Sequence, residues 1–256
     1  MLALVLSGGS AWGMAHIGVI EILDEHDIDI DMIVGTSAGA LVGALRAAGL
    51  NAQQMRKIAS DITWGDLGDV QLPTMGLFDS SDIEETLEKY IGKDRGFASL
   101  SLPLKVICTD LQRGAQVVMD AGRVATAVRA SSSIPVIFTP VVHEGRMLAD
   151  GGLVNNLPVD VARDAGADRV IAVKFGYPFR NPPGNILEVA MRSLSIMQRQ
   201  NMSDDAKNAD VLLRPDVAGI SPADLTQYET LIERGKQEAY RNLRKLKKLM
   251  QFACSL

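Results

Sequence analysis

The sequence predicts an α/β fold built from βαβ units. Short runs of aliphatic or β-branched residues alternate with longer segments of helical periodicity, which is the pattern of a sheet packed by helices. Two glycine-rich turns, at 7–13 and 35–39, each join a predicted strand to a predicted helix. Hydrophobic residues make up 47% of the chain and charged residues 22%, a balance typical of globular proteins.

The elements follow in order along the chain. The apolar run at 2–6 predicts a buried strand, 13–26 a helix, 32–34 a second strand that ends at a glycine, and 38–48 a helix of small residues. Ser80 or Ser81 is expected to cap the helix at 82–91. Later strands are predicted at 104–109, 116–119, 136–142, 169–173 and 211–213. Later helices are predicted at 122–130, 158–165, 186–201 and 224–250.

Domain organisation is expected to be simple. The 256 residues contain no internal repeat, no low-complexity segment and no Pro/Gly-rich linker long enough to divide the chain. A chain of this length can bury a sizeable core. We therefore expect a single domain over 1–256.

Composition argues against several classes of protein. With 26 basic and 31 acidic residues the formal net charge is −5, so a nucleic-acid partner is not expected. Cys108 and Cys254 lie far apart and form no CxxC pair, which indicates neither a disulfide framework nor a zinc site. No signal peptide and no membrane-spanning run is recognised at the sequence level. A cytoplasmic protein is expected, at most resting on the inner membrane surface.

The strongest catalytic motif is the pentapeptide at 35–39, which has the form GxSxG. In a nucleophile elbow the serine occupies a tight strand-to-helix turn, so Gly35 and Gly39 are needed where a Cβ would clash. The helix N-terminus behind the serine favours developing negative charge. A turn that merely packs a helix on a sheet is the alternative, but the strand–turn–helix context favours Ser37 as a nucleophile.

The other glycine-rich turn, at 7–13, has two functional interpretations. Gly8 and Gly13 match a dinucleotide-binding GxGxxG, but Ser10 occupies the middle glycine position, where the backbone must approach a pyrophosphate. The other interpretation is an oxyanion hole, in which backbone N–H groups stabilise the tetrahedral intermediate of acyl transfer. A turn with a purely structural role, without a part in binding or catalysis, is the third interpretation.

Histidine is the usual base for a nucleophilic serine, and the chain has only His16, His26 and His143. None lies after position 143, although the usual order of α/β-hydrolases ends in histidine. His143 falls in a predicted hairpin turn, and the other two flank a predicted helix. Surface or packing roles are therefore favoured for all three.

Asp150 is the better candidate for the base. A short apolar strand delivers its carboxyl group to a turn containing Gly151 and Gly152, where two glycines allow close backbone approach. A carboxylate with an ordinary pKa of about 3.9 is a weak base, so a Ser–Asp dyad needs a desolvated site. A turn aspartate that bonds its own backbone is the alternative.

Taken together, the motifs resemble the patatin-like phospholipases, of the bacterial or archaeal single-domain kind. The resemblance rests on four blocks in the family's order: the glycine loop at 8–18, the elbow at Ser37, the segment RASSSIP at 129–135, and DGG at 150–152 leading to NNLP at 155–158. It implies a three-layer α/β/α fold with a mostly parallel central sheet and a Ser37–Asp150 catalytic dyad. It also implies an oxyanion hole made by backbone N–H groups of Gly8, Gly9 and Ser10, with supporting glycines at Gly13, Gly35, Gly39, Gly151 and Gly152.

The glycine loop departs from the family pattern at two positions. Ser10 replaces the usual third glycine, and because serine keeps its N–H, the hole is retained if this residue does not require positive φ. Trp12 replaces the usual Lys or Arg. This removes a cation near a developing anion, so we expect an effect on the rate or on the preference for anionic lipids.

Two further segments have open interpretations. The apolar, glycine-broken segment at 65–78, together with Trp64, either lines an acyl pocket, acts as a lid or packs in the core. The basic amphipathic C-terminal helix either lies on an anionic membrane or packs on the protein, with late positive charges that complement the helix dipole. Packing is favoured for this helix.

These observations predict a serine acyl hydrolase acting on carboxyl esters of lipids and phospholipids. Ser37 would attack the ester, Asp150 would accept its proton, and Asn155 or Asn156 would position Asp150. No metal or organic cofactor is expected, because no ligand cluster is present in the sequence. The alternatives are a lipid transacylase with the same dyad, a nucleotide-binding module and a non-catalytic patatin-like interaction protein.

Overall fold

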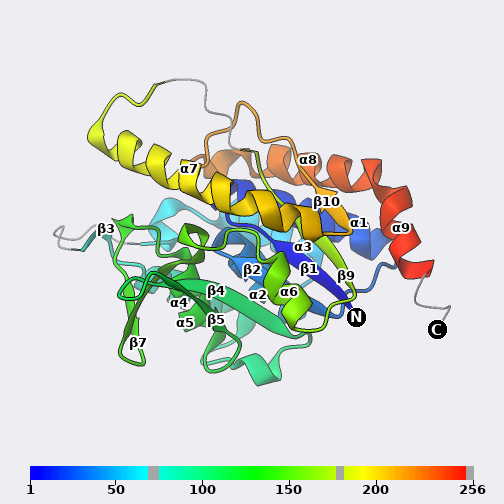
Figure 1. The fold of residues 1–256 in the computed structure, drawn as a ribbon, viewed down its shortest axis with the longest axis horizontal. Coiled ribbons are helices and arrows are strands. Elements are labelled where there is room, and N and C mark those ends of the chain that lie inside the picture. Colours follow the sequence, from blue (N-terminus) through cyan, green and yellow to red (C-terminus); the bar gives the residue numbers. More distant parts are fainter. Residues whose placement is uncertain (69–74, 177–181, 252–256) are drawn as a thin grey trace.

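The computed structural model describes residues 1–68, 75–176 and 182–251 and centres on an eight-stranded sheet (Figure 1). The strand order is β10-β9-β1-β2-β4-β8-β7, with β5 paired to β4. Strands β10 to β4 are parallel, and β5, β7 and β8 are antiparallel, which confirms the predicted mostly parallel sheet. The strands are β1 (Leu2–Leu6), β2 (Met32–Thr36), β4 (Leu104–Asp110), β5 (Ala115–Met119), β7 (Val141–His143), β8 (Arg146–Asp150), β9 (Arg169–Val173) and β10 (Val211–Leu213).

Helices cover the sheet in two layers. Because βαβ crossovers are right-handed, α1 and α2 lie on one face, and α6 and α7, which accompany the return of the chain from β8 to β10, lie on the other. Strands β1 and β2 are buried at every position, as this arrangement requires. The helices are α1 (Met14–Glu25), α2 (Ala38–Ala47), α3 (Ala52–Asp61), α4 (Ser81–Ile91), α5 (Val124–Ser132), α6 (Val159–Asp164), α7 (Ile186–Asp205), α8 (Tyr228–Arg241) and α9 (Leu243–Gln251).

Helices α1 and α8 pack backbone to backbone, and Figure 1 shows the two running side by side although they come from opposite ends of the chain. A Cβ added to Gly18 would collide with the carbonyl oxygen of Ile232, and one added to Gly235 would collide with that of Ala15. Reciprocal glycines therefore let the two helices approach more closely than side chains would allow.

Four elements differ from the predictions. Helix α3 was not predicted, although Asn51 and Gln54 form a reciprocal capping box at its start. The predicted strand 136–142 is two strands, β6 (Val136–Phe138) and β7. Pro140 separates them, and β6 pairs instead with a short strand, β3 (Gly76–Phe78), in a second sheet. The predicted helix 224–250 is divided into α8 and α9 at Asn242.

Two local predictions concern the start of α4 and the packing of α9. Ser80 occupies the N-cap position of α4, but its side chain makes no capping hydrogen bond, and Asp79 accepts the N–H of Ser81 instead. The apolar side of α9 packs on the core through Leu246 and its neighbours, which confirms packing as the favoured role of this helix. Within the described residues, no helix is long and apolar enough to cross a bilayer. The single-domain assignment stays a prediction.

Candidate active site

Ser37 lies on a strained turn between β2 and α2. Its backbone has φ 53° and ψ −122°, a conformation that L-residues rarely adopt and that costs on the order of 1–3 kcal/mol. Gly39 makes the turn possible, because a Cβ there would collide with the carbonyl oxygen of Leu6 on the neighbouring strand. The N–H of Ser37 donates to Ser131 Oγ at 2.8 Å, and that hydroxyl donates to the carbonyl oxygen of Ile107 at 2.6 Å. The turn is thus held from α5 and β4.

The carboxyl group of Asp150 is buried at the end of β8, with 1% of the residue exposed. Its Oδ1 accepts the N–H of Gly152 at 2.7 Å. The backbone N–H of Asp150 donates to the carbonyl oxygen of Ser133 at 3.0 Å, and its carbonyl oxygen accepts from Thr109 Oγ1 at 2.8 Å. The predicted turn interaction is therefore present, together with anchors from two other elements.

Burial raises the pKa of Asp150 from 3.8 to about 6, while the nearby Ser37 hydroxyl and the Gly152 N–H oppose the rise. Within the described residues, Asp150 Oδ2 has no hydrogen bond of standard length and angle. This oxygen is therefore the one available to the Ser37 hydroxyl, and such contacts commonly tighten only when substrate binds. A raised pKa makes the carboxylate a better base near neutral pH.

The glycine loop after β1 lies beside Ser37, because β1 and β2 pair in register with Leu6 opposite Gly35. A Cβ added to Gly8 would lie 3.1 Å from Ser37 Cβ. The hydrogen bonds between described residues do not use the N–H groups of Gly8, Gly9 or Ser10. Backbone donors that face no protein acceptor are what an oxyanion hole requires.

The sequence made retention of the hole depend on Ser10 not requiring a positive φ, and this condition is not met. The φ of Ser10 is 53°, the left-handed region in which L-residues are strained by roughly 1–2 kcal/mol. The N–H of Ser10 is nevertheless used by no hydrogen bond to another described residue, so it stays available as a donor. The supporting glycines Gly8, Gly9, Gly13, Gly35, Gly39, Gly151 and Gly152 have no such φ and instead provide room for close neighbours. In this site, positive φ falls on two serines, and the motif glycines allow close packing.

The side chain of Trp12 is buried against other parts of the fold. The residue is 3% exposed, its indole Nε1 donates to the carbonyl oxygen of Ile220 at 3.0 Å, and its ring meets Phe175 edge-on. It does not line the cavity described below. The indole therefore ties the glycine loop to the segment before α8, and the expected effect on an anion in the site has no support in this geometry.

The asparagines predicted to position Asp150 have other partners. Asn155 Nδ2 donates to Gln116 Oε1 and Asp160 Oδ1, both at 2.8 Å. Asn156 Nδ2 donates to Met202 Sδ at 3.5 Å, and its Oδ1 lies close to Gly8 and Gly152. Gly152, Ser133 and Thr109 hold Asp150 instead.

Ser131 and Ser133 were missed as supporting residues. Both belong to the RASSSIP segment, and the structure shows that the end of α5 holds the nucleophile turn through Ser131 and the Asp150 backbone through Ser133. The sequence signal was the serine triplet at the end of a predicted helix. Nothing local indicated which strand or turn each hydroxyl or carbonyl would reach.

The three histidines have no direct place in the site. His16 is fully buried in α1, His26 lies beside Tyr240 with ring centroids 6.5 Å apart, and His143 ends β7. None of them lines the cavity. The preference for a carboxylate base over an imidazole is consistent with this arrangement.

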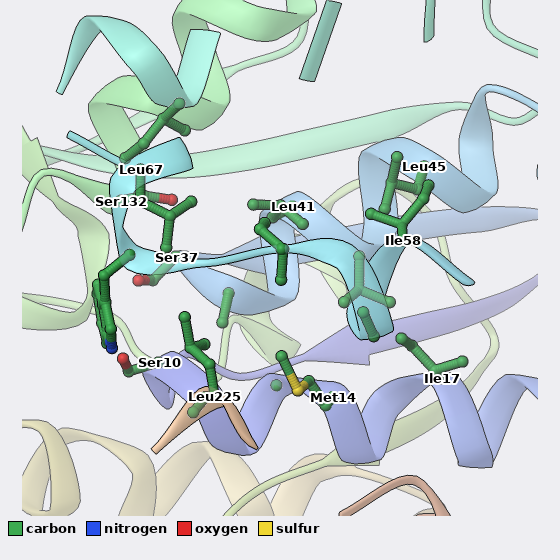
Figure 2. Close-up of a pocket in the computed structure, with 18 of the residues that line it drawn as sticks. Ser10, Met14, Ile17, Ser37, Leu41, Leu45, Ile58, Leu67, Ser132 and Leu225 are labelled. Carbon is green, nitrogen blue, oxygen red and sulfur yellow. The ribbon is translucent and has the colours of Figure 1, made fainter. Parts of the chain in front are cut away.

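An apolar cavity of about 120 Å³ opens at Ser37. Figure 2 shows Ser10, Ser37 and Ser132 at one end, and Ile17, Leu45 and Ile58 at the other. The walls include residues of α1, α2 and α3, single residues of α4 and β6, and Leu225 before α8. Trp64 and Leu67, from the stretch for which a pocket-lining role was open, also line the cavity. Val70 and Leu72 of that segment lie outside the described residues. The cavity has the character of a site for a hydrocarbon chain.

A strained serine on a strand–helix turn, a buried carboxyl group and a glycine loop beside an apolar cavity are typical of α/β serine acyl hydrolases. The patatin-like phospholipase family model matches residues 4–163, and the chain belongs to this family. Membership in the family supports lipid hydrolase activity.

Curated relatives agree with this assignment. The chain is 35% identical over 183 residues to human patatin-like phospholipase domain-containing protein 6, covering 68% of this chain and 13% of that protein. It is 30% identical over 272 residues to an uncharacterized NTE family protein of Mycobacterium tuberculosis, covering 93% of this chain and 46% of the relative. The chain thus spans less than half of the length of these relatives.

Two solved structures share the fold. VipD from Legionella pneumophila aligns with a TM-score of 0.61 at 16% identity, covering 96% of this chain and 66% of that chain. The type III effector protein ExoU aligns with a TM-score of 0.57 at 16% identity, covering 95% and 53%. At this identity the likeness concerns the fold.

Proposed function

We propose that the chain is a serine acyl hydrolase that cleaves carboxyl esters of lipids, phospholipids included, through an acyl-enzyme on Ser37. One observation carries the proposal: the strained serine opens onto an apolar cavity and has the buried Asp150 carboxyl group as its neighbour. Membership in the family supports lipid hydrolase activity, and the dyad, the role of the glycine loop and the order of steps are the finer parts of the proposal.

In acylation, Ser37 Oγ attacks the ester carbonyl carbon and its proton passes to Asp150 Oδ2. The carbonyl oxygen becomes an oxyanion and accepts hydrogen bonds from the backbone N–H groups of Gly8, Gly9 and Ser10. When the intermediate collapses, the carbon–oxygen bond to the alcohol breaks, and the leaving oxygen takes the proton held by Asp150. The acyl group remains on Ser37.

In deacylation, water replaces the alcohol. Asp150 accepts a proton from the water as its oxygen attacks the acyl carbon, and a second tetrahedral oxyanion forms in the same loop. Collapse of this intermediate breaks the bond to Ser37 Oγ, which recovers its proton from Asp150, and the fatty acid leaves. No step needs a group that the chain does not supply.

The cavity defines the class of acyl group. Its lining is apolar apart from the three serines at one end, so the burial of methylene groups, about 0.8 kcal/mol each, would provide most of the binding energy. A head group would remain outside, beside the glycine loop. Such esters are found at membrane surfaces, so contact with the inner face of the cytoplasmic membrane is part of the proposal.

The first test is intact-mass analysis after treatment with a fluorophosphonate probe, which labels activated serines. Wild type should gain one adduct, Ser37→Ala should gain none, and Ser10→Ala should still be labelled. The matched serine of the other turn controls for nonspecific reaction. A folded wild type that stays unlabelled, or equal labelling of Ser37→Ala, would overturn the nucleophile assignment and favour a non-catalytic interaction protein.

Product analysis then separates hydrolysis from acyl transfer. Wild-type enzyme that has not been treated with the probe is incubated with phosphatidylcholine vesicles, with and without an added long-chain alcohol, and the products are identified by mass spectrometry. Free fatty acid in both incubations supports a hydrolase. If acyl groups appear only on the alcohol, the activity is that of a transacylase.

A further inference from the structure

Among the described residues, the imidazole of His16 makes one hydrogen bond, which reaches the glycine loop beside Ser37. The imidazole is fully buried in the first turn of α1, and its Nε2 lies 2.9 Å from the carbonyl oxygen of Ser7. A carbonyl oxygen can only accept, so Nε2 carries the proton and Nδ1 is the unprotonated nitrogen. Within the described residues Nδ1 has no hydrogen-bond partner.

Packing alone gives no reason for a polar ring at this position. His16 lies against Phe175, a buried core residue, with ring centroids 4.8 Å apart. Burial lowers the pKa of His16 to about 4, so the ring is neutral near neutral pH. A buried imidazole with one unpaired nitrogen is less favourable than an apolar side chain of similar volume. The contribution of His16 is therefore its Nε2–H.

The Nε2–H of His16 binds the carbonyl oxygen of the peptide group between Ser7 and Gly8, and the N–H of this peptide group lies beside Ser37. The carbonyl of Ser7 and the N–H of Gly8 belong to the same planar trans peptide, in which the two groups point in opposite directions. A carbonyl fixed by His16 therefore fixes the direction of the Gly8 N–H. This N–H has no acceptor among the described residues, and Gly8 lies next to Ser37.

We propose that His16 is a positioning residue for the oxyanion hole: by donating to the Ser7 carbonyl oxygen it orients the Gly8 N–H toward the oxyanion. The proposal rests on the proposed hydrolase function, in which Gly8 provides one of the donors. His16 neither touches substrate nor transfers a proton. Its effect should fall on the transition state, where charge develops, more than on the bound ester.

A pair of nearly isosteric variants isolates the hydrogen bond. His16→Gln places an N–H donor at about the same reach as Nε2, and His16→Met fills similar space without a donor. Because removal of one oxyanion donor costs roughly 10²–10³ in kcat, we expect a misdirected donor to lower kcat of His16→Met by about 10- to 100-fold. KM should change less than about threefold, and His16→Gln should recover most of the rate. Ile20→Ala, on the same helix, controls for loss of stability.

A second readout reports on the oxyanion directly. An alkyl trifluoromethyl ketone forms a hemiketal oxyanion with the serine, whereas the matching alkyl alcohol does not. In His16→Met, the inhibition constant of the ketone should rise by about the factor by which kcat/KM falls. The inhibition constant of the alcohol should stay within about threefold of its wild-type value. Equal kcat in His16→Met and His16→Gln would overturn the positioning role, and so would a loss of kcat in Ile20→Ala as large as that in His16→Met. Fluorophosphonate labelling of wild type would then still support the hydrolase. If wild type is unlabelled, the proposed function fails first.

Discussion

The two glycine-rich turns occupy equivalent places on neighbouring parallel strands, and each contains a serine with φ 53°. The two turns differ in which group of the serine remains without a hydrogen bond from the surrounding described residues. The N–H of Ser37 is taken by Ser131 Oγ, so its hydroxyl is the group presented to Asp150. The N–H of Ser10 is used by no hydrogen bond between described residues. With the same φ, one turn therefore presents a side-chain hydroxyl and the other a backbone N–H, which are the two groups that the proposed mechanism uses.

Exchange of each serine for alanine gives the largest contrast. Ser37→Ala removes the nucleophile and should lower ester hydrolysis by more than about 10³-fold. Ser10→Ala keeps the backbone N–H and should stay within about fivefold of wild type. Initial rates on a medium-chain p-nitrophenyl ester, with circular dichroism to verify folding, measure both. Similar losses in the two variants would mean that the division into side-chain and backbone roles is wrong.

Asp150→Asn should have the next largest effect on rate, a loss of about 10²–10³-fold, since a neutral amide cannot accept the proton of Ser37. In wild type the reactive form is the carboxylate, so kcat/KM should fall as the pH decreases through about 6. A pH–rate profile from pH 4.5 to 8.5 measures this. A profile that is flat across this range would exclude Asp150 as the titrating base.

The same substitution should increase stability. Because the pKa of Asp150 is about 6 in the folded chain and 3.8 in its ordinary state, protonation contributes stability below about pH 4 that is lost as the pH rises through 6. Asp150→Asn lacks this loss and should be more stable than wild type at pH 7, by up to roughly 3 kcal/mol. Urea unfolding of both proteins at pH 4 and pH 7 tests this prediction. The extra stability of Asp150→Asn over wild type should be smaller at pH 4 than at pH 7.

Gly8→Ala should displace the glycine loop without removing any of its backbone N–H donors. The new Cβ would lie 2.5 Å from Asn156 Oδ1 and 3.1 Å from Ser37 Cβ, so the loop must shift by a few tenths of an ångström. We expect about a 10- to 100-fold loss of kcat. Gly145→Ala in the β7–β8 turn serves as a distant glycine control, and an equal loss there would point to a general effect on folding.

Ser10→Gly should have the smallest effect. Glycine accepts φ 53° without steric strain, so the variant should be more stable by up to about 1 kcal/mol, reduced by the entropy of a more flexible unfolded chain. The N–H is kept, and activity should stay within about threefold of wild type. Thermal unfolding and rates on the same ester measure both. A large loss of rate would reveal a role for the Ser10 hydroxyl.

The local parts of the site were predictable because their signals are local. The GxSxG turn needs small residues within a few positions, and strands 2–6 and 32–34 are short apolar runs, so order and context in the sequence were sufficient. The parallel sheet followed from the alternation of strand and helix. Asp150 could be singled out because its strand and its two glycines adjoin it.

The supports of the site depend on residues far apart in the sequence. Ser131 reaches a backbone N–H 94 positions earlier, and no local pattern specifies that partner. The φ of Ser10 is set by tertiary packing, and the direction of Trp12 depends on Ile220, more than 200 residues later. The division of 136–142 was marked by Pro140, but the pairing of its first half with β3 was not.

The reciprocal glycines of α1 and α8 also bear on how this chain can change. The family match ends at residue 163, yet α8 packs its backbone on the helix that carries His16 and follows the glycine loop. A side chain gained at Gly18 or Gly235 would push α1 away from α8 and move the glycine loop with it. We expect neither position to tolerate a side chain, and we expect a truncation at residue 163 to lose the proposed esterase activity.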